Sequence, residues 1–447
     1  MKRSPAYIRL IVFCLRIAVL LTAAGSLLQC AAPKQTGTYH KIKHFFEKVD
    51  LFENAFTGFV LYDPIGGKEI YSRNRAKYFT PASNTKIFTL YTALQVLEDS
   101  LPALTYLARL DSLYVWGMGD PTIKHHSFAA RDRALDWLQN RTEQIVLCTT
   151  PNETKRFGPG WAWDDYQYGY QAERTSLPLY SNKVQIQYDS LSRQIILSPA
   201  SLRASVKWDD RGYRIERGLS DNAFQIQLQE GLPSFTSFSP FYTDKWITSR
   251  LLSTSIGRTV VVQEHCPEIS QGTILYGEQV DTVYKYFMQN SDNFIAEQLL
   301  QVCSGLLFDT MDIDRMIRFA KDNFLSDLSD ELLWYDGSGL SRYNMFTPRS
   351  IVELLTKLWQ EHSQDRLFSI FPAGGKSGTI ANWYGSDEPF VFAKTGTLRN
   401  NHCLSGYLIT DRGKTLIFSF MHNHYPGSSV TIKQGMAKVL DFVKRNY

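Results

Sequence analysis

The sequence lacks any surplus of basic charge once its first thirty residues are set aside. Four of its 48 basic side chains, Lys2, Arg3, Arg9 and Arg16, lie in those thirty residues, which contain no acidic residue. The other 44 are matched by 44 acidic side chains. A protein that binds a polyanion needs an excess of lysine and arginine, so nucleic acid is not an expected partner.

Cysteine is also scarce, and its spacing excludes the common metal and redox motifs. Of the six cysteines, Cys14 and Cys30 lie in the first thirty residues, and the others are far apart, at Cys148, Cys266, Cys303 and Cys403. None of these spacings matches a zinc or thiol-redox motif. We interpret the four as buried free thiols; the alternative is one or two disulfides, which an oxidising compartment permits but the sequence does not assign.

Histidine offers no better metal site. His422 and His424 could lie on one face of a strand, but no third ligand accompanies them. We therefore interpret them as structural residues and expect neither a metal nor a cofactor.

The first thirty residues are typical of an export signal. Basic residues precede an apolar run over residues 17–28, which is too short and too early for an ordinary membrane-spanning helix. The run ends in Leu27-Leu28-Gln29-Cys30, which resembles the lipobox of bacterial lipoproteins, although Gln29 departs from the usual small residue. We expect export to the periplasm. A lipid anchor on Cys30, cleavage nearby and an uncleaved anchor are the open alternatives.

The 447-residue chain is long enough for two or three domains. Hydrophobic residues make up 44% of it and charged residues 21%, which is ordinary for a globular protein with a large core. Residues 40–51 have helical periodicity, and residues 56–72 alternate as a hairpin around a Pro-Ile-Gly-Gly turn. Alternation and dense aromatics then extend from about residue 104 to 274, which predicts a β-rich region.

Helical character returns after this region. Helical patterns cover residues 280–303, 311–324 and 350–362, strand patterns cover 390–394, 403–410 and 415–421, and a helix begins near 429. We predict one domain formed by residues 39–103 and 275–447, in which strands from both ends share a sheet beside a helical lobe. The β-rich region 104–274 would be an insertion, long enough for two small domains.

One stretch combines a helix start with a nucleophile and a base. Pro81 disfavours helix before it, and from Ser83 onward apolar residues recur at helical spacing, to an expected end near Pro102. Lys86 lies one turn after Ser83 on the same face. Its amine could take the hydroxyl proton if burial or positive charge lowered its pKa from about 10.4. A helix cap followed by a surface lysine would look the same, but this is the only S-x-x-K in the chain.

Two further motifs give this stretch its context. In order, the sequence contains Ser83-x-x-Lys86, Ser291-Asp292-Asn293 and Lys394-Thr395-Gly396. This trio occurs in class A β-lactamases and penicillin-binding proteins. Further signals are Gly-Met-Gly-Asp-Pro at 117–121, Pro-Gly-Trp-x-Trp-Asp-Asp at 159–165, Asp-Gly-Ser-Gly-Leu-Ser-Arg at 336–342 and the long interval 87–290. Together these features resemble the serine D-Ala-D-Ala carboxypeptidases of the penicillin-binding protein 4 type, peptidase family S13, from about residue 55 onward.

The resemblance implies both a fold and an activity. The fold would be of the α/β (α+β) class, penicillin-recognising serine transpeptidase or β-lactamase-like, with a sheet, a helical lobe and a large β-rich insertion. The activity would be carboxypeptidase or endopeptidase cleavage of peptidoglycan stem peptides through an acyl-enzyme. Penicillin and other β-lactams would be covalent inhibitors, and no cofactor or metal would take part.

Catalytic roles follow from the same resemblance. Ser83 would attack the carbonyl carbon between two D-alanines, Lys86 would accept its proton, and Ser291 would relay a proton to the leaving amine. The backbone amides of Ser83 and Thr397 would form the oxyanion hole.

Substrate-binding roles are implied in the same way. Asn293 would hold the substrate amide, and Lys394 would supply positive charge beside it. Thr395 and Thr397 would offer hydroxyls to the terminal carboxylate, on the strand that contains Gly396.

Two of the motifs have near copies, at Ser220-Asp221-Asn222 and Lys376-Ser377-Gly378. The first copy leads into an alternating strand, whereas Ser291 leads into a helix, and the chemistry needs a helix junction. The second copy follows a turn, whereas Lys394 continues an apolar strand that could pair with an extended peptide. We therefore choose positions 291 and 394.

Asp164 and Asp165 are candidates for substrate selectivity. The diaminopimelate side chain of many stem peptides carries an ammonium and a carboxylate, which an acid and an aromatic wall could recognise. The Trp-Ala-Trp-Asp-Asp stretch at 161–165 offers both. The alternative is that the aspartates cap a turn while the tryptophans fill a core.

Two other functions are alternatives to the peptidase. A class A β-lactamase uses a glutamate in an E-x-x-x-N loop, and no glutamate in this chain has an asparagine four residues later. A catalytically idle cell-wall-binding protein would not need the intact trio. Both remain alternatives to be tested.

Overall fold

The computed structural model describes residues 37–49, 52–128, 132–152, 154–209 and 212–447. The predicted signal over residues 1–30 and the candidate lipidation site Cys30 lie outside these residues. In the part of the chain that is described, no helix is both long enough and apolar enough to span a bilayer.

Strands from both ends of the chain form one antiparallel sheet. In sheet order they are β14 (Val391–Leu398), β15 (Asn401–Ile409), β16 (Thr415–Asn423), β1 (Phe56–Asp63) and β2 (Lys68–Arg73). β1 and β2 form the predicted hairpin, and Phe56 at the start of β1 pairs with Asn423 at the end of β16. The expectation that the two ends share a sheet is confirmed.

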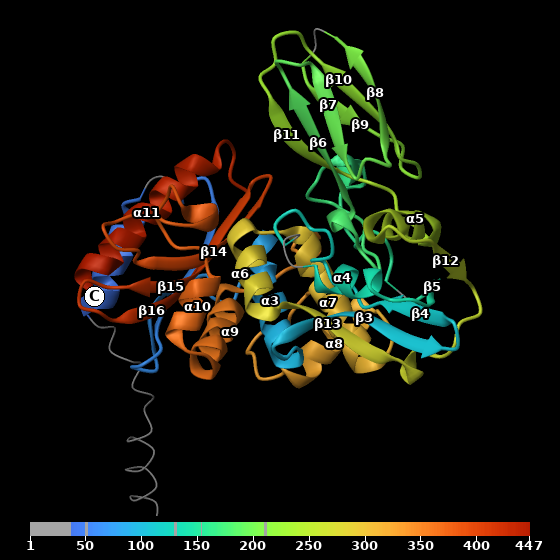
Figure 1. The fold of residues 1–447 in the computed structure, drawn as a ribbon. Helices are drawn as coiled ribbons and strands as arrows, with labels where there is room; N and C mark the ends of the chain where they lie inside the picture. The colour runs from blue at the N-terminus through green and yellow to red at the C-terminus, as the bar shows by residue number, and fades with distance from the viewer. Residues whose placement is uncertain (1–36, 50–51, 129–131, 153, 210–211) are drawn as a thin grey trace, which may run out of the picture.

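Helices cover both faces of this sheet (Figure 1). On one face lie α2 (Gly37–Glu47) and α11 (Ser429–Asn446), where the rings of Phe45 and Phe442 stack with centroids 4.2 Å apart. The helices of the lobe on the other face are α3 (Thr85–Val96), α6 (Val280–Asn290), α7 (Asn293–Phe308), α8 (Ile313–Asn323), α9 (Pro348–Glu361) and α10 (Gln364–Ile370). Because both faces are covered, β15 and β16 are buried almost throughout.

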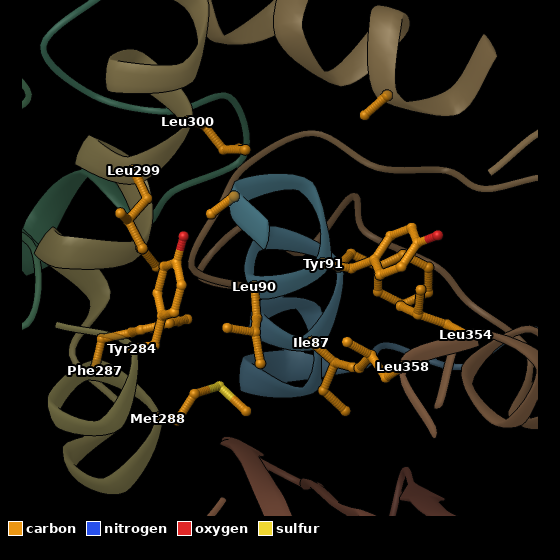
Figure 2. Close-up of a cluster of buried hydrophobic side chains, with 14 of the residues drawn as sticks. Ile87, Leu90, Tyr91, Tyr284, Phe287, Met288, Leu299, Leu300, Leu354 and Leu358 are labelled. Carbon is orange, nitrogen blue, oxygen red and sulfur yellow. The ribbon is translucent and has the colours of Figure 1, made fainter. Parts of the chain in front are cut away.

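The helix α3 runs through the middle of this lobe and is buried along most of its length. Figure 2 shows Leu90 facing Tyr284 and Met288 of α6, with Tyr91 beside Leu354 of α9 on the opposite side. A helix that is buried on every side is held by packing around it, so its N-terminus has a fixed position.

This helix is shorter than the sequence indicated. It ends at Val96 because Leu97 is already extended, and the chain then enters β3 (Ser100–Arg109). Pro102 lies inside that strand, opposite Tyr276.

The inserted region contains a second five-stranded sheet. Its strands, in sheet order, are β12 (Val260–Gln263), β5 (Gln144–Cys148), β4 (Ser112–Gly117), β3 and β13 (Thr273–Gln279). β3 and β13 are antiparallel neighbours, so the chain enters and leaves this region side by side. They straddle the boundaries predicted near residues 104 and 274; the division into domains itself stays a prediction.

Two three-stranded sheets form the projection at the top of Figure 1. One contains β11 (Phe235–Pro240), β6 (Lys183–Asp189) and β7 (Gln194–Ser198), and the other β8 (Arg203–Trp208), β10 (Ala223–Leu228) and β9 (Arg214–Glu216). They share one apolar core with the second sheet and with two helices that the sequence did not indicate, α4 (Arg133–Gln139) and α5 (Lys245–Ile256).

Two of the four cysteines beyond residue 30 form a disulfide and the other two are free thiols, so each of the two predicted alternatives holds for one pair. Cys148 at the end of β5 forms a disulfide with Cys266, and their Cα atoms are 6.0 Å apart. Cys303 and Cys403 are buried free thiols.

Candidate active site

Ser83 lies on a tight turn that leads directly into α3. The turn, η2 (Ala82–Asn84), is a single 3-10 helix in which Ala82 has a φ of 48°, a left-handed conformation that costs energy for alanine. Gly339 makes room for this turn, because a Cβ at that position would come within 2.0 Å of the carbonyl oxygen of Ala82. The half-buried Ser83 is thereby held at a helix N-terminus, where unpaired amides favour developing negative charge.

The amine of Lys86 is buried beside this hydroxyl. Its Nζ donates to Ser83 Oγ (3.0 Å), to Asn293 Oδ1 (2.6 Å) and to the carbonyl oxygen of Ser338 (2.7 Å). Burial lowers the pKa of Lys86 to about 8, although nearby carboxylates oppose the change. A pKa near 8 leaves roughly a tenth of the amine neutral at pH 7, so it can accept the Ser83 proton.

Ser291 and Asn293 reach the site from the junction of α6 and α7. Ser291 ends α6 with a φ of 54°, and Asp292 caps α7 by accepting a hydrogen bond from the amide of Ile295 (2.9 Å). This reversal brings the Ser291 hydroxyl and the Asn293 amide to the same side as Lys86. The motif lies at a helix junction, as the choice of position 291 required.

Lys394 approaches Ser291 from the sheet. Its Nζ donates to Ser291 Oγ (2.7 Å) and to the carbonyl oxygen of Thr395 (2.8 Å). Burial, and then the positive charge of Lys86, lowers the pKa of Lys394. The positive charge of each lysine therefore disfavours the charged form of the other. A substrate carboxylate bound nearby would favour the charged form of both lysines.

The strand that contains Lys394 runs directly past the nucleophile. A Cβ on Gly396 would come within 3.0 Å of the amide nitrogen of Ser83, so only glycine allows this approach. The Thr397 side chain lines the cleft described next, whereas the hydroxyl of Thr395 donates to Thr379 Oγ1 (2.8 Å) and the side chain is nearly buried. The Thr397 hydroxyl lies 2.8 Å from His402 Nδ1, so both hydroxyls have a partner, and of the two residues only Thr397 lines the cleft.

These side chains open onto a cleft of about 1000 Å³. Ser83, Ser291, Asn293 and Thr397 lie on its wall from the sheet and the helical lobe. The sequence did not single out several other residues that line it, namely Tyr168, Tyr170, Gln171, Leu398, Arg399 and Tyr425.

Asp164 and Asp165 line the same cleft, within η4 (Trp163–Gln167) of the inserted region. Asp164 is exposed and Asp165 is half-buried, and no side chain caps η4. Burial and the neighbouring Asp165 carboxylate raise the pKa of Tyr170. Trp163 is 83% exposed, so the alternative in which both tryptophans fill a core does not hold for this one.

A buried ion pair between Arg174 of the inserted region and Glu297 of α7 is connected to Lys86 through Ser338. Arg174 Nε and a terminal nitrogen donate to Glu297 Oε2 at 2.9 and 2.5 Å, and both side chains are almost fully buried. Glu297 Oε1 accepts from the amide of Ser338 (2.7 Å), whose carbonyl accepts from Lys86. No local pattern in the sequence indicates this pair. One signal in the sequence could have indicated that Glu297 has a partner. Glu297 is a charged residue within a mainly apolar helix, and a buried charge needs a partner.

The Asp336 carboxylate accepts hydrogen bonds that hold the glycine-rich segment 336–342 in place beside the Ser83 turn. Its Oδ1 accepts from the amide of Gly339 (2.9 Å) and from Asn344 Nδ2 (2.7 Å). Its Oδ2 accepts from the amide of Ser341 (2.6 Å) and from Trp161 Nε1 (2.9 Å). The inserted region is thereby attached to the segment that shapes the Ser83 turn.

The near copies of the motifs lie elsewhere. Asn222 exchanges hydrogen bonds of 2.8 and 2.7 Å with the backbone of Tyr242 in the inserted region. Lys376 is exposed in a turn after α10. Neither residue lines the cleft.

Histidine and acidic side chains form no candidate metal centre in the described residues. His422 is buried, and its Nδ1 lies 2.8 Å from Thr57 Oγ1.

Comparison with known proteins identifies the family of this fold and site. The sequence profile of the D-Ala-D-Ala carboxypeptidase 3 (S13) family matches residues 39–211 and 277–443. A D-alanyl-D-alanine carboxypeptidase of Actinomadura sp. (strain R39) is 25% identical over 91% of this chain and 85% of its own. D-alanyl-D-alanine carboxypeptidase DacB of Haemophilus influenzae is 22% identical over 97% of this chain and 98% of its own.

Solved structures agree on the fold. The crystal structure of penicillin binding protein 4 from H. influenzae superposes on this chain with a TM-score of 0.73. The two sequences are 19% identical, and the match covers 89% of this chain and 99% of the other. Its complex with a β-lactam has a TM-score of 0.67 at 18% identity, over the same shares of the two chains. The predicted α/β fold with a large insertion is confirmed, and the chain belongs to the D-Ala-D-Ala carboxypeptidase 3 (S13) family.

Proposed function

We propose that this protein is a serine D-Ala-D-Ala carboxypeptidase and endopeptidase that cleaves peptidoglycan stem peptides through an acyl-enzyme on Ser83. The observation that carries the proposal is the buried Lys86 Nζ, 3.0 Å from Ser83 Oγ. A serine hydroxyl beside an amine of lowered pKa is the arrangement that acyl transfer requires. Membership of the family and the activity named for its relatives support the same reaction.

The reaction has two halves. Ser83 Oγ bonds to the carbonyl carbon of the penultimate D-Ala while its proton passes to Lys86. The resulting oxyanion faces the amides of Ser83 and Thr397. It collapses as the C–N bond breaks, while the proton held by Lys86 passes through Ser291 to the leaving amine, so that Lys86 is neutral again and Ser291 keeps its hydroxyl. Water then attacks the ester carbonyl as neutral Lys86 takes its proton. Lys86 returns that proton to Ser83 Oγ as the ester C–O bond breaks, and the shortened peptide leaves.

The terminal carboxylate of the substrate fits the strand end of the cleft. Thr397 lines that part of the cleft, and the fully buried amine of Lys394, whose pKa is lowered by burial and by Lys86, donates to Ser291 Oγ on the same wall. A bound carboxylate would favour the charged form of Lys394. A peptide that ends in a free carboxylate would therefore gain an interaction that a peptide ending in an amide lacks.

Benzylpenicillin is expected to form one covalent adduct, on Ser83, because its strained amide presents the same carbonyl to the same nucleophile. Intact-mass analysis followed by peptide mapping measures this, and Ser83→Ala should form no adduct. Rapid loss of the adduct with turnover of penicillin would identify a β-lactamase instead. An adduct on another serine would overturn the assignment of the nucleophile.

We also propose that Asp164 or Asp165 recognises the diaminopimelate side chain of the stem peptide. Both aspartates line the same cleft as Ser83, and Arg342 lines it too, so the cleft offers both signs of charge. An ammonium and a carboxylate on one substrate side chain would match that pattern.

Asp164→Asn or Asp165→Asn is therefore expected to lower kcat/KM on diaminopimelate-containing peptides by about tenfold, the effect of one lost charge-assisted contact. Penicillin acylation should stay nearly unchanged, because the β-lactam lacks that side chain. Equal losses on both would indicate a folding defect, and no loss with either variant would exclude both aspartates from this role.

We further propose that the protein is exported to the periplasm, free or attached to the membrane through a lipid on Cys30. The basic and apolar composition of residues 1–30 supports export. The Cys148–Cys266 disulfide fits an oxidising compartment.

A further inference from the structure

A second hollow, of about 600 Å³, adjoins the active-site cleft. Tyr168 and Tyr170 line both spaces, so they form a shared wall. The far side of the hollow is formed by the projection, with Tyr213 and Arg214 from the β9 side and Phe238 from β11. The reaction proposed for Ser83 uses none of these three residues.

The shared wall has the form of an aromatic platform. The rings of Tyr168 and Tyr170 stack with centroids 5.5 Å apart and planes 10° from parallel. Tyr168, Tyr170 and Tyr213 are 56%, 46% and 43% exposed. Three partly exposed tyrosines around one hollow present apolar ring faces together with hydroxyl groups, which suits a ligand that is itself both apolar and hydroxyl-rich.

The platform is held in place by the inserted region. A Cβ on Gly169, between the two tyrosines, would come within 2.9 Å of the carbonyl oxygen of Phe238, so the segment lies directly against β11. Before it, the Tyr166 hydroxyl donates to the carbonyl oxygen of Arg217 (2.9 Å). Ser239 Oγ donates to the carbonyl oxygen of Gln167 (3.1 Å). These contacts on both sides keep the rings in a fixed position, which lowers the entropic cost of binding.

The charge of the hollow favours a neutral ligand. Arg214 is the single charged residue among the described residues that line it. Its guanidinium already pairs with Glu216 at 2.6 Å. Serine, glutamine and tyrosine provide the remaining polar groups. A peptide rich in charged side chains would leave its charges unpaired there, whereas amide and hydroxyl groups would find partners.

We propose that this hollow binds the amino-sugar chain to which the stem peptide is attached. The inference rests on the proposed function, because the cleft must hold the stem peptide for the hollow to meet the sugar. An extended chain covers roughly 3.3–3.6 Å per residue, so the three residues before the D-alanines place the sugar roughly 10 Å beyond them. The tyrosine wall common to both spaces provides the continuous surface along which the peptide passes to its sugar.

The test compares two substrates on the full chain: the free stem pentapeptide and the same pentapeptide attached to its disaccharide. Wild-type protein is expected to have the higher kcat/KM on the disaccharide-linked form. Tyr213→Ala should lower kcat/KM on that form by about fivefold, mainly through KM, and should change the free pentapeptide by less than twofold. Tyr213→Phe keeps the ring and should keep most of the preference.

Trp246→Ala is the matched control, since Trp246 is an exposed aromatic residue of the inserted region that lines neither space. It should change neither substrate. The proposal is overturned if the wild type does not distinguish the two substrates, or if Tyr213→Ala weakens both equally. Failure of the wild type to cleave either peptide would instead contradict the proposed function.

Discussion

Lys394→Ala is expected to lower the rate constant for penicillin acylation of Ser83 by about 100-fold or more, the scale seen when one preorganised polar group is removed from an acyl-transfer site. Lys394 Nζ donates to Ser291 Oγ at 2.7 Å and lies fully buried beside the proton-relay serine. Its removal leaves that hydroxyl without its donor and removes the charge that a bound carboxylate would meet. Stopped-flow acylation with a chromogenic β-lactam measures the loss.

Lys376→Ala provides the matched comparison. It removes the lysine of the near copy, which is exposed and lies outside the cleft. Acylation should stay within about twofold of wild type, as is usual for exposed surface positions. If Lys376→Ala were the damaging change and Lys394→Ala the mild one, the assignment of the third motif would be wrong.

Arg174→Ala is expected to destabilise the protein by about 3–5 kcal/mol, because it leaves the buried carboxylate of Glu297 without its cation. The loss should also slow acylation, since Glu297 holds Ser338, whose carbonyl accepts from Lys86. Urea unfolding followed by fluorescence measures the first effect. Lys245→Ala, which breaks the exposed pair with Glu264 (2.7 Å), should cost less than about 1 kcal/mol.

The cost of Arg174→Ala should depend on pH. Burial raises the pKa of Glu297, and Arg174 is the largest influence that lowers it. Without Arg174 the folded-state pKa rises further above the unfolded value, so the variant loses stability as pH rises through that pKa. The deficit should therefore be smaller at pH 5 than at pH 8. A deficit independent of pH would show that lost packing, rather than the unpaired charge, causes the destabilisation.

Ser83 and Arg174 differ in how far their contacts can be predicted from the sequence. Ser83 and Lys86 are one helical turn apart, so their contact follows from helix geometry alone. Ser291 and Lys394 were found because each motif stands beside a clear helix or strand pattern. Arg174 carries no such pattern. Its partner Glu297 is 123 residues away, and only the packing of the inserted region against α7 brings them together.

Local features could be predicted from the sequence: the start of the helix at Ser83, the hairpins, the helix junction at Ser291 and the strand that contains Lys394. These depend on backbone preferences and on periodicity over a few residues, which the chain records directly. Only the packed fold brings Cys148 to Cys266, leaves Thr395 nearly buried while Thr397 lines the cleft, and places Tyr168 and Tyr170 in the same cleft as Ser83. Each of these features depends on how segments that are distant in the sequence pack against one another. No short-range pattern in the sequence specifies that packing.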